Sequence, residues 1–248
     1  MRLMKPMAWT LALGVLGNLF CPLAQAQNEQ TTRMETALLS PERPFEDKER
    51  DASRRPIQTV QFLGIETGDT VIDVIAAGGW FTEVLSAAVG PSGKVLAQNP
   101  AFFVSQPNFA ATEKARHDRL SNVQAVHGEL AAAGIVAQAD AAVTALNLHD
   151  IYNGQGGEAA AVAFAKGVYD ALKPGAVFGV IDHVGIEGQN NAQFHRLQIA
   201  QARDVLTKAG FRIEAESDIL RNPGDDHTKP VRDMAGRTDQ LLIRARKP

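Results

Sequence analysis

The segment 71–80, VIDVIAAGGW, constrains the fold of this chain more than any other feature. An apolar strand pattern, VIDVI, ends at small residues, and a helix pattern, WFTEVLSAAV, begins at once. A strand, a tight turn and a helix in this order form the layout in which α/β proteins bind nucleotide-like cofactors, because backbone N–H groups at the helix start meet the ligand. The segment therefore predicts an α/β fold with a candidate cofactor turn.

The rest of the chain continues the alternation of strands and helices. Strand patterns lie at 70–75, 94–99, 122–128, 140–148 and 176–184, and helix patterns lie at 80–89, 108–120, 157–175 and 190–210. Two final strand patterns, 211–220 and 239–248, have no helix between them. This order predicts a doubly wound, mainly parallel seven-stranded sheet with helices on both faces and an antiparallel last strand.

The first residues have the pattern of a secretory signal peptide. Arg2 and Lys5 precede an apolar core, TLALGVLGNLF, and LAQAQ supplies small residues for cleavage after Ala26. The apolar run is shorter than the roughly 20 residues of a membrane span, although an uncleaved anchor is the alternative. We therefore expect a periplasmic or secreted protein with a signal peptide at 1–26, a polar arm at 27–55 and one domain at 56–248.

Composition excludes several kinds of chemistry from the mature protein. Cys21 is the only cysteine and would leave with the signal peptide, which excludes disulfides, zinc–thiolate sites and cysteine nucleophiles. Loss of Arg2 and Lys5 would also take the net charge from −3 to about −5. We expect no nucleic-acid partner, and no stable membrane association after cleavage.

The motifs at the strand ends resemble those of the class I S-adenosylmethionine-dependent methyltransferases. VIDVIAAGGW resembles the first motif, VHGEL the third-strand motif, DAAVTALNLHDIY the fourth and ALKPGAVFGVIDH the fifth. Within the family, the GG-aromatic loop and the HD pair after strand four are similar to a predicted exported subgroup. The resemblance covers residues 56–248 and implies a Rossmann-like methyltransferase fold, S-adenosylmethionine as cofactor and a small-molecule acceptor.

The chain departs from the family pattern at two points. The first motif, D-x-G-x-G-x-G, places glycine at 75, 77 and 79, but this chain has Ile75, Ala77 and Gly79. Glycine is expected there because a Cβ would intrude where the backbone approaches the cofactor. The family usually has an acid after the second strand, and Asn99 stands there. A dinucleotide site would need G-x-G-x-x-G and a later acid, which are absent from this segment.

The resemblance assigns cofactor-binding roles to residues at the carboxyl ends of the first three strands. Asp73 would anchor the turn and approach the methionine amino group, Asn99 would bind the ribose, and Glu129 the adenine amino group. The alternatives are a turn cap for Asp73 and a plain surface acid for Glu129. The predicted cofactor-binding residues are Asp73, Ala77, Gly78, Gly79, Asn99 and Glu129, the backbone N–H groups of residues 77–79 facing the cofactor.

The predicted catalytic residues are His149 and Asp150, which follow the fourth strand. A neutral His149 would take a proton from the acceptor, and Asp150 would orient it or bind the acceptor. The alternative is a capping Asp beside a hydrogen-bonded His. Asp182 and His183 repeat the pair one strand away.

We predict no metal site from the sequence. Asp150, Asp182 and His183 stand at positions similar to the divalent-metal ligands of small-molecule O-methyltransferases, but histidine is a poor ligand for magnesium. His117, His127 and His195 are expected to be ordinary residues, with His195 inside the helix at 190–210. Trp80, at a helix start, is expected to be a core residue.

Two functions are compatible with these features. The first is an exported S-adenosylmethionine-dependent methyltransferase acting on a small molecule. The second is a non-catalytic periplasmic ligand-binding protein on a methyltransferase scaffold, favoured by the degenerate glycine loop and by the cytoplasmic origin of S-adenosylmethionine.

The N-terminal pattern predicts that the mature protein begins at or near Gln27. Mass spectrometry of the protein from its native host measures this terminus. An intact Met1 terminus in the soluble cytoplasmic fraction would exclude export.

Overall fold

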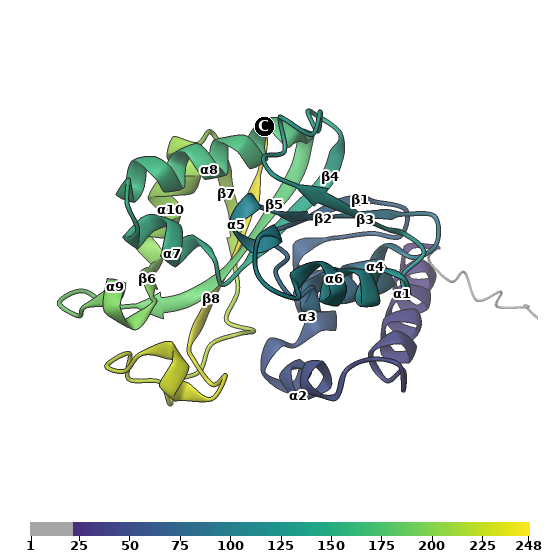
Figure 1. The fold of residues 1–248 in the computed structure, drawn as a ribbon, viewed down its shortest axis with the longest axis horizontal. Helices are drawn as coiled ribbons and strands as arrows, with labels where there is room; N and C mark the ends of the chain where they lie inside the picture. Colours follow the sequence, from purple (N-terminus) through teal and green to yellow (C-terminus); the bar gives the residue numbers. More distant parts are fainter. Residues whose placement is uncertain (1–21) are drawn as a thin grey trace, which may run out of the picture.

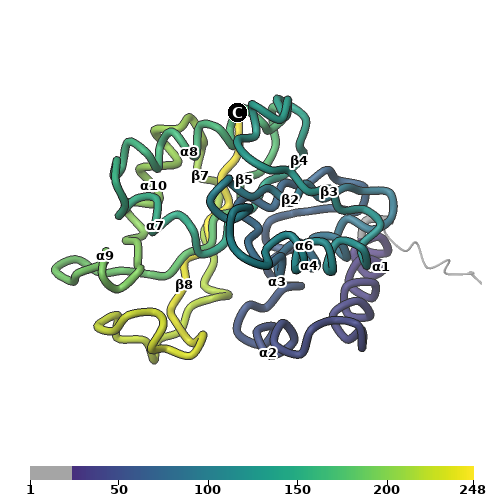
Figure 2. The backbone as a smooth tube through the Cα atoms, in the orientation of Figure 1, coloured from purple at the N-terminus to yellow at the C-terminus, as the bar shows by residue number. Residues whose placement is uncertain are grey.

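A mainly parallel β-sheet runs through the structure, a computed structural model that describes residues 22–248 (Figures 1 and 2). The predicted signal peptide therefore lies largely outside the described residues. The strands are β1 (Thr70–Val74), β2 (Lys94–Asn99), β3 (Val123–His127), β4 (Ala139–Ala145), β5 (Leu172–Gly185), β6 (Leu197–Gln198), β7 (Arg212–Glu216) and β8 (Gln240–Arg246).

The strand order is β3-β2-β1-β4-β5-β8-β7, with the two-residue β6 paired to the end of β5. The first five strands in this order, from β3 through β2, β1 and β4 to β5, are parallel to one another. Strand β8 lies between β5 and β7 and is antiparallel to both. This confirms the predicted doubly wound sheet with an antiparallel last strand. The order reverses between β1 and β4, which is where open α/β sheets bind ligands.

Helices cover both faces of the sheet, as Figure 1 shows. One apolar core lies under α8 and α10, and the other lies under α1, α3 and α4. No helix among residues 22–248 is both long enough and apolar enough to cross a membrane. The helices are α1 (Pro22–Leu38), α2 (Phe45–Arg54), α3 (Pro56–Leu63), α4 (Trp80–Val89), α5 (Ala101–Val104), α6 (Phe109–His117), α7 (Leu148–Asn153), α8 (Gly157–Ala171), α9 (Asn191–Phe194), α10 (Ile199–Lys208) and the 3₁₀ helix η1 (Val231–Met234).

The segment predicted as a polar arm, residues 27–55, is instead packed onto the domain. It forms most of α1 and all of α2, and α1 packs against α4. Met34 and Leu38 are buried in the core beside α4. Gln30 donates to the carbonyls of Ile65 and Ala88, so a polar side chain caps the end of α4, whose last carbonyls lack helical partners. The polar composition concealed these few buried contacts.

The helix predicted over 190–210 is interrupted. His195 adopts a left-handed backbone with φ 55°, and Leu197–Gln198 pairs with β5 before α10 begins. Gln198 and Gln201 form a capping box at the start of α10, which supplies the N-terminal hydrogen bonds that a new helix needs. The single amphipathic pattern therefore contains two helices, and His195 lies outside both.

The packing of α1 predicts a measurable cost for its loss. Met34→Ala should lower the free energy of unfolding by about 2–5 kcal/mol, because a fully buried side chain leaves a cavity. Urea unfolding measures this, and Glu35→Ala, on an exposed position of the same helix, is the control. Equal effects of the two substitutions would show that α1 does not contribute to the core.

Candidate functional site

The turn between β1 and α4 has a left-handed backbone at alternate residues. Ile75, Ala77 and Gly79 have φ values of 58°, 48° and 76°. These are the three positions at which the family pattern has glycine. A β-branched residue at positive φ is a strong outlier, and such strain is found mainly at functional sites. The backbone conformation that glycine favours is therefore kept, although Ile75 and Ala77 stand in place of two glycines.

Side chains from the end of β2 hold this turn. Gln98 Oε1 accepts from the N–H of Ile75 at 3.0 Å, and Asn99 Oδ1 accepts from the N–H of Ala77 at 2.7 Å. The N–H of Gly79 donates to the carbonyl of Ala76 at 2.8 Å. This arrangement differs from the expectation that the N–H groups of residues 77–79 face a cofactor, because two of the three already have partners. Gly78 is exposed at the turn.

Asn99 lies deeper than a simple ribose ligand would. It is buried, and its Nδ2 lies 3.4 Å from Glu113 Oε1 of α6. The other oxygen of Glu113 contacts His127 Nε2 at 2.8 Å. Glu129, the predicted adenine ligand, is exposed after Gly128. Glu113 was missed in the sequence because the spacing of α6 carries no motif.

Asp73 is buried inside the fold, and its Oδ2 accepts from Thr82 Oγ1 at 2.6 Å. Burial raises the pKa of Asp73 to about 6, although hydrogen bonds from Thr82 and the charge of Arg116 oppose the shift. Asp73 therefore links β1 to α4, which is the capping role left open as the alternative in the sequence.

Helix α2 and Arg116 cover the turn. A Cβ on Gly79 would lie 2.6 Å from Arg116 Cδ, so glycine is required there by contact as well as by φ. Arg116 forms ion pairs with Glu83 of α4 at 2.5 Å and with Asp47 of α2 at 2.7 Å. Trp80 is buried and donates to the carbonyl of Asp47 at 3.0 Å. The N-terminal helices thus close over the start of α4.

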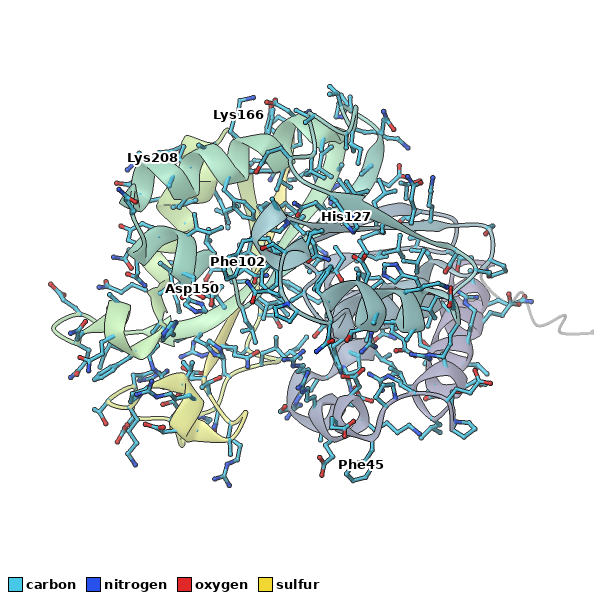
Figure 3. The ribbon with its side chains drawn as sticks, viewed as in Figure 1. Phe45, Phe102, His127, Asp150, Lys166 and Lys208 are labelled. Atoms are coloured by element: carbon cyan, nitrogen blue, oxygen red, sulfur yellow. The ribbon has the colours of Figure 1, made fainter. Side chains whose placement is uncertain are left out.

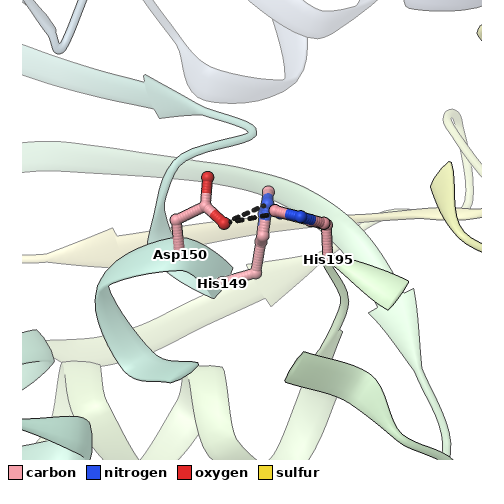
Figure 4. Close-up of side chains that lie close together, drawn as sticks. All are labelled: His149, Asp150 and His195. Carbon is pink, nitrogen blue, oxygen red and sulfur yellow. Dashed lines mark hydrogen bonds and ion pairs between the residues drawn. The ribbon is translucent and has the colours of Figure 1, made fainter. Parts of the chain in front are cut away.

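A second cluster lies beyond the ends of β4 and β5, where α7 carries His149 and Asp150 (Figures 3 and 4). His149 Nδ1 contacts Asp182 Oδ1 at 2.6 Å, and Asp182 is fully buried. His149 Nε2 lies 3.3 Å from Asp150 Oδ1, and the same oxygen lies 2.7 Å from His195 Nδ1. Parallel pairing of β4 and β5 brings these groups together.

The charges of this cluster change the role open to His149. Burial lowers the pKa of His149, but hydrogen bonds to Asp150 and Asp182 outweigh it and raise the pKa to about 9. Hydrogen bonding to His149 lowers the pKa of Asp150 to about 2. The raised pKa favours the protonated form of His149 in this arrangement, which argues against the predicted general base.

His183 is close to the cluster but has a different environment. Burial lowers the pKa of His183 to about 4, and its Nδ1 lies 2.7 Å from Thr238 Oγ1. Its ring centre is 5.5 Å from that of His149. His195, which we expected to be an ordinary helical residue, instead joins the cluster. The sequence showed no sign of this, because the apolar spacing does not show that the helix ends just before His195.

Comparison with known proteins identifies the fold. No protein-family model and no curated protein sequence matches this chain. A crystal structure of a SAM-dependent methyltransferase from Aquifex aeolicus is similar over 88% of this chain and 98% of its own, with 18% identity and a TM-score of 0.58. Fibrillarin from Aeropyrum pernix, solved with natively bound S-adenosyl-L-methionine, is similar over 79% of this chain and 76% of its own, with 14% identity and a TM-score of 0.52.

One similar structure is named as a cyclase and not as a methyltransferase. The [4+2]-cyclase SpnF is similar over 90% of this chain and 96% of its own, with 18% identity and a TM-score of 0.59. The chain therefore has the Rossmann-like fold of S-adenosylmethionine-dependent methyltransferases. A protein named as a cyclase shares that fold, so the fold alone does not determine the reaction.

Burial of Asp73 predicts a pH-dependent stability. Its folded pKa, about 6, exceeds the ordinary value of 3.8, so the stability it contributes is present below pH 3.8 and is lost as the pH rises through about 6. Asp73→Asn should become more stable relative to wild type between pH 4 and pH 7, by up to about 3 kcal/mol.

Urea unfolding of both proteins at several pH values measures this difference. Asp170→Asn changes an exposed carboxylate and serves as the control. A difference between Asp73→Asn and wild type that does not change with pH would contradict the raised pKa of the buried Asp73.

Proposed function

We propose that this protein is an S-adenosylmethionine-dependent methyltransferase that acts on a small-molecule acceptor. The observation that carries the proposal is the left-handed backbone of Ile75, Ala77 and Gly79. A left-handed conformation costs a residue with a Cβ about 1–2 kcal/mol. Ile75 and Ala77 both keep this left-handed conformation at positions where the family has glycine. The cost of doing so twice indicates that the function of the turn requires this backbone path.

The residues around the turn fit such a cofactor in part. A Cβ at Gly78 would have no atom within 4 Å, so the backbone is open to a ligand there. Asn99 carries both a donor and an acceptor suited to ribose hydroxyls, but its oxygen would have to leave the N–H of Ala77. Asp73 is buried and bonded to Thr82, so contact with the methionine amino group would require a local change.

Access to the site requires movement of its cover. The cavity between Trp80, Leu146 and Gln240 measures only about 10 Å³. The Arg116–Asp47 ion pair and the Trp80 hydrogen bond join α2 to the turn. Opening of α2 is therefore the step that would admit an acceptor.

The bound cofactor would supply a methyl group activated by a positive sulfur. The chain's own contribution would be alignment and exclusion of water, which can supply much of the rate enhancement without a base. The proposal therefore assigns no general-base role to His149, whose pKa is raised.

The alternative is a non-catalytic ligand-binding protein on the same scaffold. One observation favours it: the N–H groups of Ile75, Ala77 and Gly79 are satisfied inside the protein. Because these backbone donors already have partners, fewer free N–H groups remain to bind a ligand at the turn.

Export to the periplasm or the exterior is a further part of the proposal. Residues 24–29 are exposed on α1, and from residue 24 onward the first buried side chain of this helix is Gln30. Cleavage after Ala26 would leave every one of those buried contacts in the mature protein.

Calorimetry with S-adenosylmethionine tests the proposed function. The protein should bind the cofactor, and Ala77→Gly should bind it as well or better, because glycine relieves the strain at φ 48°. Ala77→Gly should also raise the free energy of unfolding by up to about 1 kcal/mol.

Ala76→Gly is the matched control, because Ala76 has an ordinary φ. That substitution should lower stability by about 0.4–1 kcal/mol. Absence of binding heat at millimolar cofactor in both wild type and Ala77→Gly would reject the methyltransferase proposal and leave the ligand-binding alternative.

A further inference from the structure

Three side chains, two at the start of α7 and one directly after α9, bring metal-ligating atoms together. One nitrogen each from His149 and His195 and one oxygen of Asp150 all lie within 4.8 Å of one another (Figure 4). The separations from Asp150 Oδ1 are 3.3 Å to His149 Nε2 and 2.7 Å to His195 Nδ1. Tetrahedral ligands at zinc bond lengths of about 2.0–2.1 Å stand roughly 3.3–3.4 Å apart, so a small side-chain movement would seat an ion.

The buried carboxylate of Asp182 orients the central imidazole. Its Oδ1 contacts His149 Nδ1 at 2.6 Å, and its Oδ2 accepts from the backbone N–H of His149 at 2.8 Å. This leaves Nε2 of His149 directed at Asp150. A carboxylate that holds the far nitrogen of a metal-ligating histidine is the usual outer partner of such a site.

The second imidazole is also held in place. His195 sits at φ 55°, a left-handed conformation in which histidine is enriched. The next residue, Arg196, is fully buried and forms two hydrogen bonds to Asp225, at 2.8 and 3.0 Å. Asn153 of α7 donates to the carbonyl of Arg196 at 2.9 Å. The two segments that carry the three groups are thereby joined before any ion arrives.

We propose that His149, Asp150 and His195 form a binding site for a divalent transition-metal ion such as Zn²⁺. Two imidazoles and one carboxylate suit Zn²⁺ or Fe²⁺, whereas Mg²⁺ prefers oxygen ligands alone. The carboxylates of Asp150 and Asp182 would balance the charge of the ion. Asp150 and His195 are more than half exposed, so the ion would keep open positions for water or for an oxygen or sulfur atom of a bound molecule.

This proposal does not depend on the proposed methyltransferase activity. It departs from the sequence prediction of no metal, which considered Asp150, Asp182 and His183 as magnesium ligands. The structure gives Asp182 an orienting role, turns His183 toward Thr238, and supplies His195 as the missing nitrogen.

Titration calorimetry and elemental analysis test the site, using the chain purified without a histidine tag. One equivalent of Zn²⁺ should bind, with Mg²⁺ far weaker. His195→Ala and Asp150→Asn, both at exposed positions, should each lower Zn²⁺ affinity at least tenfold. Asp182→Asn should lower it about 10–100-fold through loss of orientation. Co²⁺ should give visible absorption that His195→Ala alters.

His127→Ala removes an exposed histidine distant from the cluster and should leave affinity unchanged. Thermal unfolding of each variant checks that it is folded. Failure of wild type to bind an equivalent of Zn²⁺ would overturn the proposal, as would unchanged affinity in either His195→Ala or Asp150→Asn.

Discussion

The hydrogen bonds from Gln98 and Asn99 to the turn after β1 are the constraint on which the rest of the site depends. They satisfy the N–H groups of Ile75 and Ala77 while both residues hold a left-handed backbone. Because the backbone turns so sharply, α4 starts directly above the sheet, and Gly79 leaves room for Arg116. Arg116 then joins α4, α6 and α2 through its ion pairs. The degenerate motif is thus stabilised by neighbouring side chains rather than by glycine.

The second cluster follows from the sheet in another way. Parallel strands deliver their carboxyl ends to one edge, so Asp182 of β5 and His149 after β4 meet without any long-range sequence signal. His195 joins from a segment fixed by the buried Arg196–Asp225 pair. The two parts of the edge differ in character, because the turn after β1 is closed and internally bonded while Asp150 and His195 face solvent.

The sequence predicts the sheet well because strand hydrophobicity and helix spacing are local properties. Residues 71–74 form an uninterrupted buried run, and the closing strands β7 and β8 pair antiparallel with only the short 3₁₀ helix η1 between them. The partners of individual polar side chains are tertiary properties, and they are where prediction fails. Asn99 pairs with the backbone of Ala77, and His195 depends on a break in a helix that the apolar spacing alone would continue. The segment 27–55 likewise packs through a few buried side chains, which its mainly polar composition does not reveal.

The dependence of α1 on α4 has a consequence for the order in which the chain matures. Most of the stability of a helix in a protein comes from packing of its apolar face, and the cluster that buries Met34 consists largely of residues that follow it by dozens of positions. During synthesis, α1 therefore emerges first but is buried only after α4 has been made. Throughout that interval the apolar side chains of α1 remain unpacked.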